Sequence, residues 1–251
     1  MIQFSTAVAS WIGARSPIRS LPLARQVAYG AAAAVAAAYQ APIAGVFFSM
    51  EIVLGERAWG ELPNLALASS AGWLISRTLL GGGPLFAVSG NLALSRAALW
   101  AVPLALILGL AAPAYQKLIR SLRFTGRWPL ALLLGGLSVG LLGLHHASVW
   151  GNGDVALLEI LRNGQTLSVV ATVLALRLAA TTICVGTGTV GGVFTPTLFA
   201  GAALGFLSSQ VLHLPQPLLL AVVGLSALLA AVTHAPIMAT FMAAELTGHT
   251  V

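Results

Sequence analysis

The sequence reads Gly191-Gly192-Val193-Phe194-Thr195-Pro196 at the point where one long apolar run ends and another begins. Proline is accepted in the first turn of a helix, because its missing N–H has no intrahelical partner there. We therefore predict that a helix starts in this segment. The first turn of a helix carries about half a positive charge, and glycines give an anion access to its N–H groups. The alternative is that the glycines only allow a tight turn and close helix packing.

The composition of the chain indicates an integral membrane protein. Hydrophobic residues make up 58% of its 251 residues and charged residues only 7%, against about 25% charged in a typical soluble domain. Such a surface fits a lipid bilayer, and we expect a multi-pass protein of the cell (plasma or inner) membrane. The net charge of +6 comes from basic residues scattered between the apolar runs, which argues against binding of nucleic acid. We expect no enzyme activity, no cofactor and no metal site.

Several of the apolar runs are too short to cross a bilayer. A hydrocarbon core of about 30 Å requires about 20 helical residues, whereas runs such as residues 27–42 and 43–54 are shorter. Short apolar segments interrupted by glycine and proline are typical of helices that end at an ion or substrate site inside the membrane. The predicted fold is therefore all-α and polytopic, with short, tilted and broken helices.

The chain also contains an internal repeat. Residues 30–51 aligned on residues 224–245 give nine identities in 22 columns without a gap, and both copies contain Ala-Pro-Ile-x-x-x-Phe-x-x-x-Glu. Repeats of this kind are typical of transporters and channels whose site lies between two similar halves, which are often inverted. The pattern predicts two related halves, and a repeat-built transporter of another solute remains an alternative.

The two acids that end the repeated segments, Glu51 and Glu245, are candidates for an intramembrane function. A carboxylate in the membrane is costly and often serves as a proton relay or an ion ligand. Both acids lie near the ends of short apolar runs, where each can stay hydrated or pair with a loop arginine such as Arg57. We therefore favour a structural role for both.

These segments resemble the CLC family of voltage-gated chloride channels and chloride/proton antiporters. Residues 192–196 are similar to its Gly-x-Phe-x-Pro motif, residues 39–51 to its Asn-Ala-Pro-Leu-Ala-Gly segment, and residues 235–247 to its Ala-Pro-Leu segment ending in Glu-Met-Thr. The resemblance implies a homodimer in the lipid bilayer, each subunit with its own chloride pathway. It also implies that the N–H groups of Val193 and Phe194 bind chloride.

Three departures from the family pattern affect these expectations. The motifs that would supply a serine, a gating glutamate and a late tyrosine are absent, so the chain is expected to be an interior fragment, with residues 1–62 ending a first repeat and 63–251 covering most of a second. Ile52 stands where the antiporters carry an inner proton-accepting glutamate. The resemblance thus implies passive transport of chloride or a similar anion rather than proton coupling. The alternatives are a transport-incompetent fragment and a chloride/proton antiporter.

Overall fold

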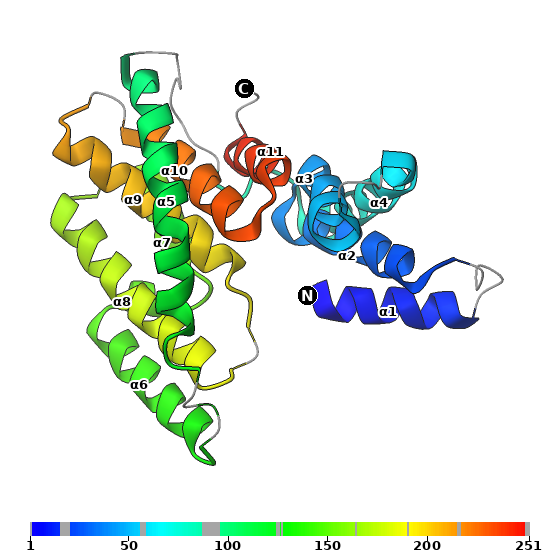
Figure 1. Cartoon of the computed structure of the whole chain (residues 1–251), viewed down its shortest axis with the longest axis horizontal. Coiled ribbons are helices and arrows are strands. Elements are labelled where there is room, and N and C mark those ends of the chain that lie inside the picture. The colour runs from blue at the N-terminus through cyan, green and yellow to red at the C-terminus, as the bar shows by residue number, and fades with distance from the viewer. Residues whose placement is uncertain are drawn as a thin grey trace. The chain divides into compact units, whose positions relative to one another are not determined.

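The computed structural model of the chain describes residues 2–15, 21–55, 59–86, 96–123, 126, 128–163, 165–189, 191–214 and 217–248. Every element within these ranges is a helix (Figure 1). In chain order the elements are α1 (Ile2–Arg15), α2 (Leu23–Tyr39), α3 (Pro42–Phe48), η2 (Ser49–Leu54), η3 (Trp59–Glu61), α4 (Leu62–Leu80), η4 (Arg96–Trp100), α5 (Ala101–Arg120), α6 (Ala131–His145), η6 (Ala147–Val149), α7 (Asp154–Asn163), α8 (Leu167–Gly186), α9 (Phe194–Val211), α10 (Pro217–Thr233) and α11 (Pro236–Thr247).

Long and short apolar helices occur together in the described part of the chain. Two segments there, Ala98–Arg120 and Leu167–Gly186, are long and apolar enough to cross a bilayer. Shorter apolar helices cover Pro42–Leu54, Ala131–His145 and Pro217–Thr233. At membrane depth the ends of such short helices need protein or water around them, because lipid offers no hydrogen-bond partner. The predicted all-α architecture with short and broken helices is confirmed.

The chain forms two compact units. Residues 1–88 and 233–251 form the first unit, which holds α1 to α4 and α11, and residues 89–232 form the second, which holds α5 to α10. The predicted boundary at residue 62 separates sequence repeats rather than compact units, and it stays a prediction.

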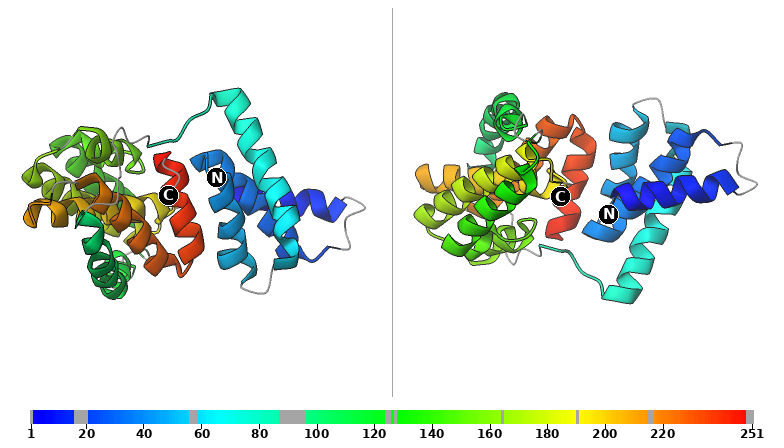
Figure 2. Two further views of the ribbon diagram at one scale, coloured as in Figure 1. Left: turned by 90° about the horizontal axis from the view of Figure 1, so that it is seen from above. Right: turned by 90° about the horizontal axis from the view of Figure 1, so that it is seen from below.

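Helix α2 lies at the centre of the first unit and packs against α1, α3 and α4. Its alanines Ala28 and Ala32 are fully buried and contact Val46, Met50 and Leu65. Alanine leaves room for neighbouring helices to approach closely, and it costs little side-chain entropy. Figure 2 shows α11 (red) alongside α3 from two further directions.

The internal repeat is visible in the backbone where α3 and α11 begin. Ala41 precedes α3 with φ −126° and ψ 78°, and Ala235 precedes α11 with φ −128° and ψ 75°. One residue earlier, Gln40 and His234 both adopt left-handed backbone conformations, with φ 54° and φ 57°. Two segments 194 residues apart therefore turn into their helices in the same way, in agreement with the repeat in the sequence.

Equivalent small residues also mediate helix packing in the two copies. A Cβ atom added to Gly30 on α2 would lie 2.7 Å from Cβ of Ala9 and 2.8 Å from the carbonyl oxygen of Ser5, both on α1. A Cβ atom added to Gly224 on α10 would lie 2.3 Å from the carbonyl oxygen of Gly201 on α9. Both glycines of this aligned pair are therefore required by a close helix approach.

The second unit packs around α8 and α9. Helix α8 lies against α5, α6 and α9, and α7 also contacts α9. Phe199 and Phe206 of α9 are almost fully buried. A separate cluster joins Leu104 and Leu108 of α5 to Leu220 of α10. These contacts bury the body of α9 within its unit.

Candidate anion site at the start of α9

Helix α9 begins at Phe194, within the glycine-rich segment where the sequence predicted a helix start. Val193 is the capping residue, with φ −89° and ψ 1°, and Pro196 lies in the first turn. The preceding helix α8 ends at Gly186. The chain then changes direction at Gly188, whose φ of 84° favours glycine. The chain therefore leaves one membrane helix and enters the next through a short glycine-rich connection.

Packing does not require the two glycines nearest the helix. Both are exposed, and a Cβ atom added to Gly191 or Gly192 would meet no described atom within 4 Å. Close helix contact therefore does not explain these two residues within the part of the chain that the structure describes. Glycines just before a helix start can give an anion access to its backbone N–H groups.

The peptide between Val193 and Phe194 has a defined orientation. The carbonyl oxygen of Val193 accepts hydrogen bonds from the backbone N–H of Thr197 at 3.0 Å and from its hydroxyl at 2.7 Å. A trans peptide is planar, with its N–H opposite its C=O. Because the carbonyl of Val193 points along α9, the N–H of Phe194 points out of the start of the helix.

Tyr115 of α5 extends this hydrogen-bonded chain. Its hydroxyl oxygen lies 3.1 Å from Oγ1 of Thr197. The single hydroxyl proton of Thr197 is already donated to Val193, so Tyr115 is the donor in this contact. Tyr115 and Thr197 therefore help to fix the orientation of the peptide group that carries the N–H of Phe194. Neither side chain could be predicted from the sequence, because the two residues lie 82 positions apart and share no motif.

A cavity of about 210 Å³ lies beside this segment. Its walls include Gly191 and Gly192, as well as Arg177, Thr181 and Cys184 from α8. Arg177 is 5% exposed although it lies in the middle of a membrane-crossing helix. The prediction that the basic residues lie between the apolar runs, as charges of the loops, is therefore wrong for Arg177. The error arose because a single arginine within an apolar run carries no pattern of its own.

The acids Glu51 and Glu245 bind the starts of each other's repeats. Oε1 and Oε2 of Glu245 accept from the N–H groups of Ile43 and Ala44 at 2.9 and 2.8 Å, at the start of α3. The carboxylate of Glu51 accepts from the corresponding pair at the start of α11, at 3.2 and 2.7 Å. Each acid is therefore an N-terminal cap of the other copy. Arg57, which we considered as a partner, lies outside the described residues.

The reciprocal caps indicate an approximate two-fold relation between α3 and α11. When two copies are related by a two-fold axis, each contact from the first copy to the second is repeated by the equivalent residues from the second copy to the first. Phe47 and Phe241, which are equivalent in the repeat, stack on each other with ring centroids 5.2 Å apart and planes 4° apart. The structural role of the two acids remains our inference.

Ile52 lies one residue after Glu51 in η2, a π-helical extension of α3. Its side chain is 40% exposed within this chain. An isoleucine at this position has no atom that titrates, so it does not take part in proton transfer. The next acid along the described chain, Glu61, belongs to a different group of residues.

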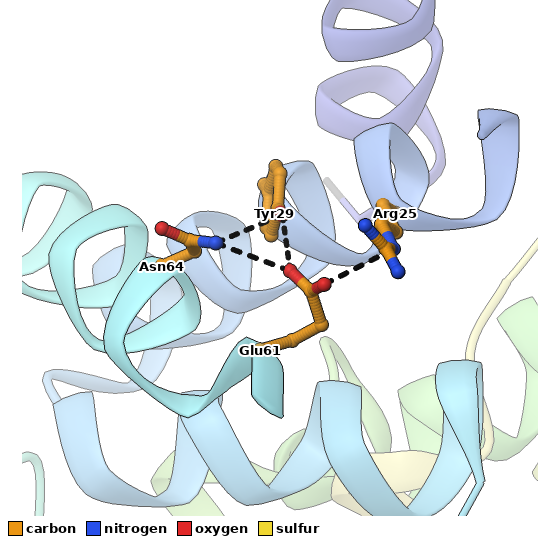
Figure 3. Close-up of polar contacts among 4 residues, drawn as sticks. All are labelled: Arg25, Tyr29, Glu61 and Asn64. Atoms are coloured by element: carbon orange, nitrogen blue, oxygen red, sulfur yellow. Dashed lines mark hydrogen bonds and ion pairs between the residues drawn. The ribbon is translucent and has the colours of Figure 1, made fainter. Parts of the chain in front are cut away.

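Glu61 forms a polar cluster with residues of α2 and α4 (Figure 3). Its carboxylate accepts from the hydroxyl of Tyr29 at 2.5 Å and from Nδ2 of Asn64 at 3.2 Å, and it pairs with Nε of Arg25 at 3.0 Å. The hydrogen bonds from Tyr29 and Asn64 lower the pKa of Glu61, since they stabilise the ionised carboxylate. The cluster fixes η3 against α2 and keeps Glu61 charged at neutral pH.

Comparison with known families identifies the chain. The family model described as "Voltage gated chloride channel" matches residues 1–251, which is the whole sequence. The chain belongs to the voltage-gated chloride channel (CLC) family. This confirms the resemblance noted in the sequence. Members of the family are membrane-embedded transporters rather than enzymes.

Curated relatives and solved structures agree with this assignment. A "Putative chloride channel protein ClcB-like" from Ralstonia nicotianae is 40% identical, with 88% of this chain and 54% of the relative covered. A "Voltage-gated ClC-type chloride channel ClcB" from Shigella flexneri is 38% identical, with 88% and 56% covered. The chain thus spans about half the length of the curated relatives it matches.

One solved structure is similar over nearly the whole chain. The crystal structure of a slow cyanobacterial Cl⁻/H⁺ antiporter matches with a TM-score of 0.88 and 25% identity, and the match covers 99% of this chain and 62% of the antiporter. A CLC-type fluoride/proton antiporter matches with a TM-score of 0.84 at 21% identity, covering 98% of this chain and 64% of that protein. The second match shows the fold alone.

Proposed function

We propose that the chain contributes to a transmembrane pathway for chloride or a similar small anion, with the N–H groups of Val193 and Phe194 as anion donors. The observation that carries the proposal is the outward-pointing N–H of Phe194, set by the double hydrogen bond of Thr197 to the carbonyl of Val193. Gly191 and Gly192, just before this N–H in the chain, are exposed, and a Cβ atom added to either would meet no described atom within 4 Å. The names of the relatives point to the same ion.

Passive transport is the mode that we favour. Ile52 offers no proton acceptor, whereas a coupled antiporter needs titratable groups along a proton path. The alternative, proton coupling, is favoured by the likeness to a Cl⁻/H⁺ antiporter. A chloride gradient imposed on sealed vesicles separates the two modes, because an antiporter then moves protons uphill and a passive pathway does not. We expect no chloride-driven proton movement above that of empty vesicles.

The assembly that we propose is a homodimer in the cell membrane, with several helices of each subunit embedded in the bilayer. Exposed apolar side chains cover α4, α5 and α6, for example Leu79, Leu110 and Leu141, which are 76, 84 and 68% exposed. Such a surface is suited to lipid or to a second subunit rather than to water.

Flux from liposomes tests the transport proposal. The purified chain is reconstituted with internal chloride, and efflux is started by valinomycin, which carries the balancing potassium. We expect efflux above that of empty liposomes. Efflux equal to that of empty liposomes would contradict the proposal and favour a transport-incompetent chain.

Two substitutions at Val193 test the backbone donors directly. Val193→Pro removes one N–H at a φ of −89°, not far from the range of proline. A hydrogen bond to a charged group contributes about 1.5–3 kcal/mol, so we expect chloride affinity to fall by about 10- to 150-fold. Val193→Ala keeps the N–H and serves as the matched control. Equal affinities in the two variants, measured by calorimetry, would refute the assignment of this donor.

A further inference from the structure

Arg177 is a buried cation whose hydrogen bonds are incomplete. Its Nη1 donates to the carbonyl oxygens of Ser148 and Trp150, and its Nη2 donates to that of Gly151 at 3.2 Å. Its Nε is buried and has no hydrogen-bond partner among the described residues. Guanidinium groups are normally fully bonded when buried, because an unmet charged donor is costly.

Within the described part of the chain the guanidinium of Arg177 also has no ion-pair partner at short range, and the carboxylate of Asp154 interacts with it electrostatically only from beyond ion-pair distance. Its other neighbours are the ring of Phe199, 5.2 Å from the guanidinium carbon, and the backbone of Gly153, where an added Cβ atom would lie 2.5 Å from Nη2. Carbonyl oxygens and a ring face stabilise a cation, but they do not neutralise it.

This cation lines the 210 Å³ cavity that also reaches the start of α9. The walls near it combine apolar side chains with the polar side chains of Asn152 and Thr181 and with the glycines of the α9 connection. A mostly apolar cavity with a few convergent polar groups is typical of a small-ligand site. The positive end of the α9 dipole and the buried guanidinium both favour a negative charge in this space.

We propose that this cavity is a second anion site, in which Arg177 binds a small monovalent anion that keeps part of its water shell. The volume exceeds that of a bare halide, so halides and small oxyanions fit the same space. The site is separate from the proposed donors at Val193 and Phe194, which are not among the residues that line the cavity. The proposal extends the proposed function, and its test gives a readout that does not depend on transport.

Cys184 provides that readout. It is the single cysteine of the chain, and it is half-buried in the wall of the same cavity. Its rate of modification by an anionic methanethiosulfonate reagent (MTSES) and by a cationic one (MTSET) reports the local potential. One guanidinium in a medium of effective dielectric constant about 20 predicts that MTSES reacts at least about tenfold faster than MTSET. Bromide, at ionic strength held constant with gluconate, should slow the reaction in a saturable manner.

Two matched variants identify the responsible charge. Arg177→Gln should abolish both the preference for MTSES and the protection by bromide. Arg120→Gln, which removes an exposed arginine of α5 outside the cavity, should keep both. If Arg177→Gln does not fold, bromide protection in the unmodified chain and in Arg177→Lys, where the charge remains, still tests the proposal.

The outcomes separate the second site from the first. Unchanged bromide protection in Val193→Pro supports a separate site, even if that variant transports no chloride. Loss of protection in Val193→Pro would overturn the proposal of two sites, since both observations would then arise from one. Equal rates for the two reagents, or no protection by bromide in the unmodified chain, would overturn the site at Arg177.

Discussion

The reciprocal caps of α3 and α11 lead to a quantitative prediction for stability. Glu245→Ala removes both acceptors from the N–H groups of Ile43 and Ala44, which are 2.9 and 2.8 Å from its carboxylate. An unmet donor away from water costs about 1–3 kcal/mol, and an N-terminal cap contributes about 0.5–2 kcal/mol. We expect a loss of about 2–4 kcal/mol in the free energy of unfolding for Glu245→Ala. We expect a similar loss for Glu51→Ala at the start of α11.

The amide variants refine this expectation. Glutamine keeps one acceptor oxygen and replaces the other by a donor. The free energy of unfolding should therefore fall about half as much in Glu245→Gln as in Glu245→Ala, or roughly 1–2 kcal/mol. Reversible unfolding in sodium dodecyl sulfate, followed by circular dichroism at constant lipid content, measures these differences. Glu159→Ala is the control, because among the described residues its carboxylate accepts a single long hydrogen bond, from Ser148 at 3.4 Å.

The double variant tests whether the two caps act as one structure. The capped helices pack against each other through the stacked rings of Phe47 and Phe241. Removing one cap should therefore disturb the geometry of the other cap. A double-mutant cycle of Glu51→Ala and Glu245→Ala should then give a coupling free energy of about 0.5–3 kcal/mol. Single losses below about 0.5 kcal/mol would refute the capping role, and additive losses would refute the coupling.

Two further predictions concern other parts of the chain. The lowered pKa of Glu61 means that its contribution to stability is present above its unfolded value of about 4.5 and is lost as the pH falls through the lower folded value. The unfolding midpoint should thus fall more steeply below pH 4.5 in the unmodified chain than in Glu61→Gln, and parallel curves would contradict this. Gly224→Ala should cost about 1–3 kcal/mol, because its Cβ atom would lie 2.3 Å from a backbone oxygen of α9. Gly136→Ala on α6, where the Cβ atom meets nothing within 4 Å, should instead stabilise by about 0.5–1 kcal/mol. Destabilisation of equal size in both glycine variants would show that close packing is not the cause.

The parts of the fold that the sequence predicted correctly depend on local chemistry. The helix start at Phe194 was predictable because glycines and a proline lie within a few residues of each other. The repeat was predictable from identical residues in the aligned copies, such as Pro42 and Pro236. These signals need no knowledge of the tertiary structure. The resemblance to the CLC family depends on local signals of the same kind, in residues 39–51, 192–196 and 235–247.

The parts that the sequence did not predict depend on contacts between distant residues. The partners of Glu51 and Glu245 are backbone N–H groups, which have no side chain to recognise, so a loop arginine was considered in their place. Arg177 was counted as a loop charge because its carbonyl partners near Ser148 lie about 29 residues away and have no sequence signature. The role of Tyr115 became visible only from the orientation of Thr197.

The reciprocal caps have a consequence for the order in which the chain folds. Glu245 is synthesised 202 residues after Ile43, whose N–H it accepts. At a synthesis rate of 5–20 residues per second, Glu245 is added to the chain about 10–40 s after Ile43. The second unit is continuous in sequence, at residues 89–232, and is completed first. During biogenesis α3 therefore needs a temporary partner for its N–H groups, such as water or the insertion machinery, until α11 enters the membrane and completes the first unit.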